Sequence, residues 1–115
     1  ALQEFLYSVI GKDGYVRLSE RVKAVMFENV HTLEPMLNGM SSGLSFTGKN
    51  AAQIKPPPLL IEGEHTTTLF RATMKALANS IPAAERYVMP KVGHGLHLEE
   101  PDAFTGVAMD FLAKH

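Results

Sequence analysis

Residues 56–64 read Pro-Pro-Pro-Leu-Leu-Ile-Glu-Gly-Glu, and this stretch is the clearest indication of the fold class. The three prolines make the chain stiff and extended. The unbroken apolar run at residues 59–61 is typical of a buried parallel strand. A loop comes next, and Thr67 or Thr68 can then cap a helix that runs through Ala78. We therefore expect a strand followed by a helix.

A second strand and a second helix follow. Residues 86–89, Arg-Tyr-Val-Met, form a short run that favours a strand, and Pro90 ends it. A glycine-rich turn leads to Pro101, where a closing helix can begin. The apolar stripe of that helix consists of Phe104, Val107, Ala108, Phe111 and Leu112. The order strand, helix, strand, helix predicts an α/β fold with a parallel sheet.

Two parallel strands do not make a stable sheet alone, because parallel sheets are covered on both faces and need more neighbours. We therefore expect the sheet to be completed by a missing segment of the same protein or by a second copy of this chain. The alternative is a small α+β domain in which a strand from the first half closes the sheet. No segment of residues 1–50 resembles such a strand.

The first half of the chain carries helical patterns instead. Apolar residues in residues 1–10 recur at the spacing of one helix face. Gly11-Lys12-Asp13-Gly14 is expected to break that helix. Ser19 can cap a second helix that runs to about Asn29. These patterns predict an N-terminal half built from helices.

A short helix and a loop are expected to end this half. Thr32 can cap the helix, which carries Pro35 in its first turn. Residues 38–50 are rich in Gly, Ser and Asn, so we expect a loop there.

Length and composition limit the function classes. The chain has 115 residues, 45% of them apolar, and a formal net charge of −1, which indicates one globular domain at most. It has no basic field that would attract nucleic acid or an anionic membrane, and no apolar run of about 18 residues that could span a bilayer. It has no cysteine, which excludes disulfides and thiolate metal sites and suits a cytoplasmic location.

His94 is the sharpest candidate for chemistry. It lies in the turn Gly93-His94-Gly95, between the second strand and the closing helix. A general base works best with a pKa near the working pH, as imidazole side chains have. The flanking glycines expose the ring and allow the backbone to approach closely. On local chemistry alone, the alternative is that His94 only fills the turn.

The second half resembles the C-terminal part of α/β-hydrolase-fold enzymes. Residues 54–64 are similar to the penultimate core strand of that family, and residues 81–90 to the last. The family's turn with the catalytic histidine and the start of its closing helix are resembled here by Gly93, His94, Glu99, Pro101 and Phe104. In the family this histidine takes the proton of a serine, or serves an aspartate nucleophile, and then activates water. The resemblance implies hydrolysis of a small ester, amide, lactone or carbon–carbon substrate, without a cofactor.

The resemblance also predicts the division of the chain. Residues 1–50 would be the end of the helical cap that many family members insert over the active site. Residues 28–33 fit a cap helix and its turn. Residues 51–115 would be the C-terminal part of the hydrolase core.

The acid partner of His94 has three open interpretations. Family members often carry Asp three residues after the glycine that ends the penultimate strand, and Thr66 stands at that position. Glu64 lies nearby and is one candidate acid. The acid could instead follow an earlier strand, upstream of Ala1, or a functional acid could be lacking.

The nucleophile is expected outside this chain. Gly39-Met40-Ser41-Ser42-Gly43 matches the Gly-x-Ser-x-Gly pattern, which requires a strand before the serine and a helix after it. Here a helix precedes and a loop follows, so we interpret Ser41 as a chance match. Losing the nucleophile of a triad costs on the order of 10⁶-fold in kcat in a serine protease. We therefore expect the isolated chain to be inactive.

The remaining candidates are substrate-binding residues, with a small molecule as the expected partner. They are His65, Thr66, Leu96 and His97. A metal site at His94 and His97 would need a helix, and Gly95 argues against one, so we expect no metal. Two other classes stay open: a non-catalytic, self-associating dimer and a small-ligand-binding protein.

Overall fold

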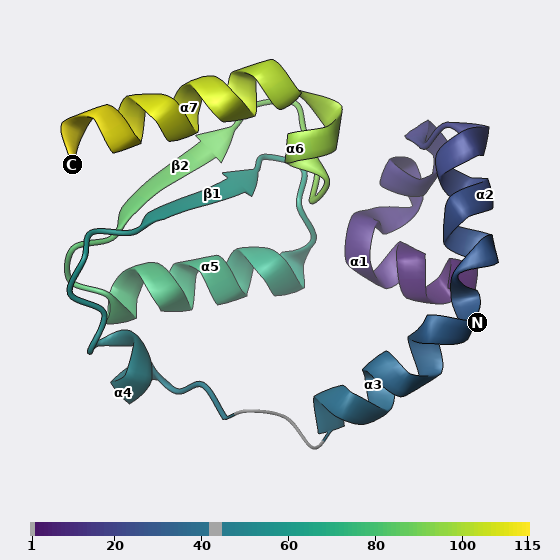
Figure 1. The fold of residues 1–115 in the computed structure, drawn as a ribbon, viewed down its shortest axis with the longest axis horizontal. Coiled ribbons are helices and arrows are strands. Elements are labelled where there is room, and N and C mark those ends of the chain that lie inside the picture. The colour runs from purple at the N-terminus through teal and green to yellow at the C-terminus, as the bar shows by residue number, and fades with distance from the viewer. Residues whose placement is uncertain (1, 42–44) are drawn as a thin grey trace. The chain divides into compact units, whose positions relative to one another are not determined.

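The computed structural model describes residues 2–41 and 45–115. It divides the chain into two compact units, Ala1–Phe46 and Thr47–His115 (Figure 1). This boundary lies four residues before the one expected from the sequence. Among the described helices, none is long and apolar enough to cross a membrane.

Every regular element described in the first unit is a helix. The elements are α1 (Leu2–Arg17), α2 (Glu20–Glu28), the 3-10 helix η1 (Val30–Thr32) and α3 (Leu33–Ser41). Ser19 caps α2 as predicted, because its side chain accepts a hydrogen bond from the Val22 N–H at 3.3 Å.

The predicted break is confirmed at Gly11 but does not extend to Gly14. Gly11 adopts φ +74°, a conformation that glycine tolerates without strain, so the chain kinks there. The helix then resumes and ends at Arg17.

The predicted loop at residues 38–50 is also partly wrong. Helix α3 extends to Ser41, and α4 (Gly48–Ala51) forms a short helix at the start of the second unit. Thr47 and Asn50 cap α4 reciprocally: the Asn50 N–H donates to the Thr47 side chain, and the Thr47 N–H donates to the Asn50 side chain.

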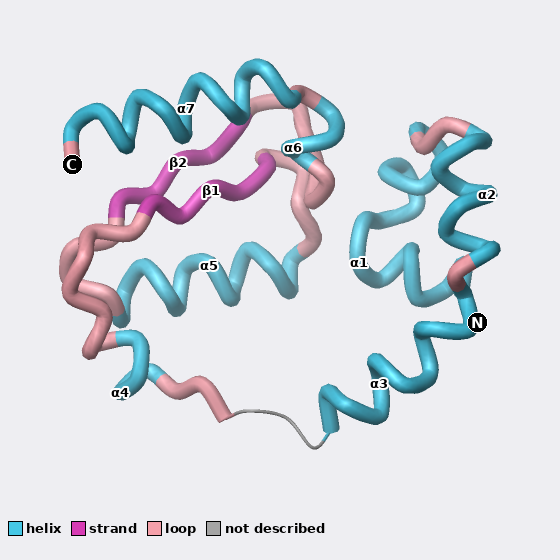
Figure 2. The backbone as a smooth tube through the Cα atoms, in the orientation of Figure 1, coloured by secondary structure: helices cyan, strands magenta, loops and turns pink. Residues whose placement is uncertain are grey.

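The second unit has the predicted strand-helix-strand-helix order. Its main elements are β1 (Leu59–Gly63), α5 (Thr68–Ser80), β2 (Glu85–Met89) and α7 (Pro101–Lys114). The strands are parallel, and their register runs from Leu59 opposite Glu85 to Gly63 opposite Met89. Helix α5 lies on one side of the two strands and α7 on the other (Figures 1 and 2). The expected α/β fold class is confirmed.

A short helix that the sequence did not predict follows the His94 turn. Helix α6 (Leu96–Glu99) begins directly after Gly95, whose carbonyl accepts hydrogen bonds from the N–H groups of Leu98 and Glu99. Gly95 was expected to prevent a helix here, but it acts as the N-cap residue, a position that glycine tolerates well.

The core of the second unit lies beside this turn. Met89, Val92 and Leu96 are buried together, and Ile61 and Phe104 pack against them. Val92 and Leu96 stand on either side of His94 in the sequence, so burial of both apolar side chains fixes the turn between them.

The two-stranded sheet leaves apolar surface uncovered. Tyr87 and Val88 on β2 are exposed, as are Met109 and Leu112 on α7. Within the described residues each strand pairs only with the other, so each keeps one unpaired edge. Both observations are typical of a sheet that is continued elsewhere.

Candidate active site

The candidate site lies where the two parallel strands end. Both strands run in the same direction, so the loops that follow them meet at one end of the sheet (Figure 1). Two backbone hydrogen bonds join these loops: the Glu64 N–H donates to the Met89 carbonyl, and the His65 N–H donates to the Val92 carbonyl, each at 2.8 Å. The loop after β1 therefore holds the turn that carries His94.

Gly63 allows the closest contact between the two loops. A Cβ atom at this position would lie 2.1 Å from the Gly93 carbonyl oxygen and 2.5 Å from that of Val92. Both neighbours are backbone atoms, which cannot rotate away as a flexible side chain would. Only glycine fits at position 63 with the His94 turn in its present place.

Glu99 holds the turn from the other side. The Gly93 N–H donates a hydrogen bond to Glu99 Oε1 at 3.0 Å. Glu99 lies in the last position of α6, so the carboxylate connects the end of that helix to the residue before His94. The sequence marked Glu99 as part of a family pattern but did not predict this contact.

The His94 ring lies flat against the Phe70 ring. Their centroids are 4.0 Å apart, and the planes differ by 9°. The His94 side chain is exposed, and its ring nitrogens form no hydrogen bond within the described part of the chain. Phe70 therefore covers one face of the imidazole and leaves its ring edge, with both nitrogens, uncovered by a hydrogen-bond partner from the described residues. Sequence patterns placed Phe70 only on the apolar side of a helix.

A small pocket opens beneath this ring pair. Its volume is about 130 Å³, and its lining comes from Ile61, Glu62, Gly63, Thr66, Phe70, Thr73, Met74, His94 and Leu96. Strand β1 and helix α5 supply most of this lining. Thr66 and Leu96, both predicted to contact substrate, share the pocket with His94.

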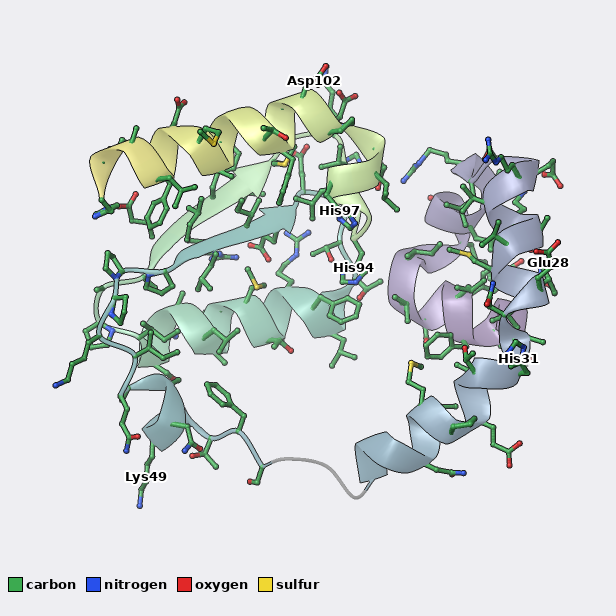
Figure 3. All side chains as sticks on the ribbon, in the orientation of Figure 1. Glu28, His31, Lys49, His94, His97 and Asp102 are labelled. Atoms are coloured by element: carbon green, nitrogen blue, oxygen red, sulfur yellow. The ribbon has the colours of Figure 1, made fainter. Side chains whose placement is uncertain are left out.

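The other two predicted substrate-binding residues lie outside the pocket lining. His97 is labelled with His94 in Figure 3, and its ring faces the edge of Phe104 at a centroid distance of 6.1 Å. His65 is exposed, and its Nε2 lies 3.8 Å from Glu64 Oε2. Their roles toward a substrate stay predictions.

Glu64 contacts the backbone of the next loop. Its Oε2 accepts a hydrogen bond from the Lys91 N–H at 2.8 Å. Lys91 has φ +64°, the left-handed conformation that residues other than glycine rarely adopt. No hydrogen bond joins Glu64 to His94 among the described residues, so the carboxylate stabilises the loop in this structure. Its role as the acid stays a prediction.

Thr66 stands at the position where the sequence resemblance led us to expect an acid. Its side chain is buried, and its N–H donates to the Gly63 carbonyl at 3.0 Å. A threonine at this position has no negative charge to stabilise an imidazolium.

The Gly-x-Ser-x-Gly match has the wrong local structure for a nucleophile. Ser41 ends helix α3, whereas the pattern requires a strand before the serine. Ser42 and Gly43 of the same match lie outside the described residues. Among the residues that the structure describes, no group of three His, Asp or Glu side chains is placed to hold a metal ion.

The structure is similar to two solved enzymes. One is the carboxylesterase CesB from Bacillus subtilis, with a TM-score of 0.56 and 24% identity over 64% of this chain and 26% of that chain. The other is a serine hydrolase involved in carbazole degradation, the CarC enzyme, with a TM-score of 0.63 and 15% identity. That match covers 99% of this chain and 46% of the other.

This chain therefore spans between a quarter and a half of the length of each enzyme. No protein-family model matches the sequence, and no curated protein sequence matches it.

Proposed function

We propose that this chain supplies the general base of a hydrolase, with His94 in that role, and its similarity in fold to part of two hydrolases supports this. The observation that carries the proposal is the presentation of the His94 ring. It lies at the carboxyl ends of the strands, stacked on Phe70, and neither ring nitrogen has a hydrogen-bond partner among the residues that the structure describes. A base needs a fixed ring and a free nitrogen, and this arrangement provides both.

The proposed reaction is hydrolysis of a small substrate such as an ester, lactone or amide. His94 removes the proton of a serine nucleophile as its oxygen attacks the substrate carbonyl. The imidazolium then gives that proton to the leaving group. His94 finally deprotonates the water that attacks the acyl-serine, and it returns this proton to the serine oxygen as the acid product leaves. With an aspartate nucleophile, His94 would act only in the water step.

The nucleophile and the oxyanion donors come from outside this chain in our proposal. The uncovered sheet edges and the partial coverage of both similar enzymes support a further segment of the same protein as their source. A second copy of this chain is the alternative source. For the acid we favour the same external segment, because Glu64 Oε2 is engaged by the Lys91 N–H.

An ester-hydrolysis assay tests the role of His94. We expect His94→Ala in the complete protein to lower kcat by about 10³-fold or more, since a base that serves both steps is lost. His115→Ala is the matched control, because it removes an imidazole that pairs with Glu85 and has no place in the site. Equal rates for wild type and His94→Ala would remove His94 from the mechanism.

A non-catalytic role in small-ligand binding is the second candidate. The observation that favours it is the pocket beneath His94, which exists without any external segment. Ligand binding by a protein that hydrolyses no ester would support this candidate over the first.

A further inference from the structure

Glu62 is a buried carboxylate with one oxygen left without a partner. The residue is 5% exposed and lies on β1. Its Oε1 accepts a hydrogen bond from Arg86 Nη2 on β2. Its Oε2 is buried and has no hydrogen-bond partner among the described residues. An unpaired buried acceptor is costly, so such an atom indicates a missing donor.

The Glu62 side chain lies on the α5 side of the sheet. Neighbouring residues of a strand face opposite sides, and Ile61 packs in the core cluster that includes Phe104 of α7. Glu62 therefore faces α5, which contributes Phe70, Thr73 and Met74 to the pocket beneath His94. Glu62 also lines this pocket. Its Oε2 is closed off from solvent in the structure, and a rotation about the broad terminal torsion of the glutamate side chain would turn this oxygen toward an occupant.

Charge restricts the kind of donor that fits. The Arg86 guanidinium already neutralises the Glu62 carboxylate. A cation in the pocket would leave one buried positive charge uncompensated, and an anion would face an unpaired carboxylate oxygen. A neutral hydroxyl group provides the donor and adds no charge.

Volume restricts the size of the occupant. The pocket holds about 130 Å³, and most of its exposed lining surface is apolar. A dry apolar cavity of about 150 Å³ in another protein accepts benzene. A molecule of about one ring therefore fits, with its apolar body against Phe70 and Met74.

We propose that this pocket is a binding site for small neutral hydroxyl compounds, whose hydroxyl donates a hydrogen bond to Glu62 Oε2. The site needs no nucleophile and no catalytic turnover. It would give a hydrolase a preference for an alcohol or phenol group, and it would equally serve a protein that only binds such compounds.

Phenol and toluene provide the test, because they share one shape and differ in the hydroxyl donor. We expect both to shift the Met74 methyl signal in NMR titrations of the wild-type protein, with phenol binding at least as tightly as toluene. If its hydroxyl found no partner, phenol would bind about tenfold or more weakly than toluene. Tighter binding of toluene by that factor, or no binding of either compound, would overturn the proposal.

A paired substitution isolates the carboxylate. Glu62→Met with Arg86→Met replaces the ion pair by apolar side chains, a change that is often neutral for folding. We expect the phenol-to-toluene affinity ratio to fall by about tenfold in this variant. Glu85→Gln, which alters an exposed carboxylate on the neighbouring strand, should leave the ratio unchanged. An unchanged ratio in the paired variant would contradict a role for Glu62.

Neither binding measurement depends on hydrolysis. Failure of the hydroxyl-site proposal can therefore be told apart from failure of the proposed catalytic role of His94. Loss of the phenol preference with retained ester turnover would reject the hydroxyl site alone. Retained preference in an inactive protein would reject the catalytic role alone.

Discussion

Gly93 and Glu99 are joined across the His94 turn by a hydrogen bond from the Gly93 N–H to Glu99 Oε1 at 3.0 Å. The bond connects the backbone just before the candidate base to the end of helix α6. It acts on His94 only through the backbone, so Glu99 is a positioning residue. Its removal should change the placement of the imidazole and leave its chemistry intact.

We expect Glu99→Ala to lower kcat by about tenfold or more in ester hydrolysis, because small displacements of a catalytic group are costly. Glu99→Gln should restore most of the rate, since an amide oxygen still accepts the Gly93 N–H. Steady-state kinetics of both variants checks this.

Glu100→Ala is the control for that comparison, because the neighbouring side chain is exposed. Equal losses in Glu99→Ala and Glu99→Gln would show that the negative charge matters, not the hydrogen bond. Equal losses in Glu99→Ala and Glu100→Ala would deny Glu99 any specific role.

Gly63→Ala should destabilise the protein strongly. The added methyl group would meet the Gly93 carbonyl oxygen at 2.1 Å, so one of the two loops must move. We expect a loss of about 1–3 kcal/mol in the free energy of unfolding, as overpacking typically costs, and reduced activity in the folded fraction. Denaturant titration measures the first effect.

Gly106→Ala is the matched control for that substitution. Gly106 lies inside α7, and a Cβ atom there meets nothing within 4 Å. Alanine favours a helix interior over glycine by about 0.5–1 kcal/mol, so this variant should be as stable as wild type or more so. A Gly63→Ala variant as stable as Gly106→Ala would contradict the close approach of the two loops.

The order of elements in the second unit could be predicted because its signals are local. Proline and glycine bound both strands, and Thr67 stands at the N-cap of α5. The resumption of the helix after Gly11 and the helix after Gly95 were missed for a related reason. A glycine signals a change of direction, but the conformation of the next residues depends on hydrogen bonds that the sequence does not display.

The contacts that make the site could not be predicted, because they join residues distant in sequence. Phe70 and His94 are 24 positions apart, and so are Glu62 and Arg86. The strand register brings Glu62 and Arg86 together, and the packing of α5 on β1 brings Phe70 to the His94 turn. The sequence displays neither the register nor this packing. The position of His94 itself was predictable, since it depends on the flanking glycines and on a family pattern.

Phe70→Leu should weaken the placement of the His94 ring. Leucine fills similar volume but offers no ring face, and an aromatic pair is worth about 0.5–1.5 kcal/mol. We expect kcat to fall by about twofold to tenfold, and the His94 ring proton signals in NMR to move downfield as the ring current of Phe70 is lost. Phe70→Tyr should preserve both properties.

Leu69→Ala is the control for Phe70, because Leu69 is the adjacent residue on α5 and is 68% exposed. It should alter neither the rate nor the His94 signals. Unchanged His94 signals in Phe70→Leu would mean that the two rings do not stack in solution.

Glu64→Gln distinguishes an acid from a loop-stabilising residue. In the structure Glu64 Oε2 accepts the Lys91 N–H at 2.8 Å, and glutamine keeps an acceptor oxygen for that bond. We therefore expect the variant to retain kcat within about fivefold, whereas replacing the acid of a triad by its amide costs about 10⁴-fold. Glu64→Ala, which removes the acceptor, should instead lower stability by about 1 kcal/mol, because Lys91 at φ +64° then loses its partner. A collapse of kcat in Glu64→Gln with unchanged stability would identify Glu64 as the acid and place all but the nucleophile and the oxyanion donors within this chain.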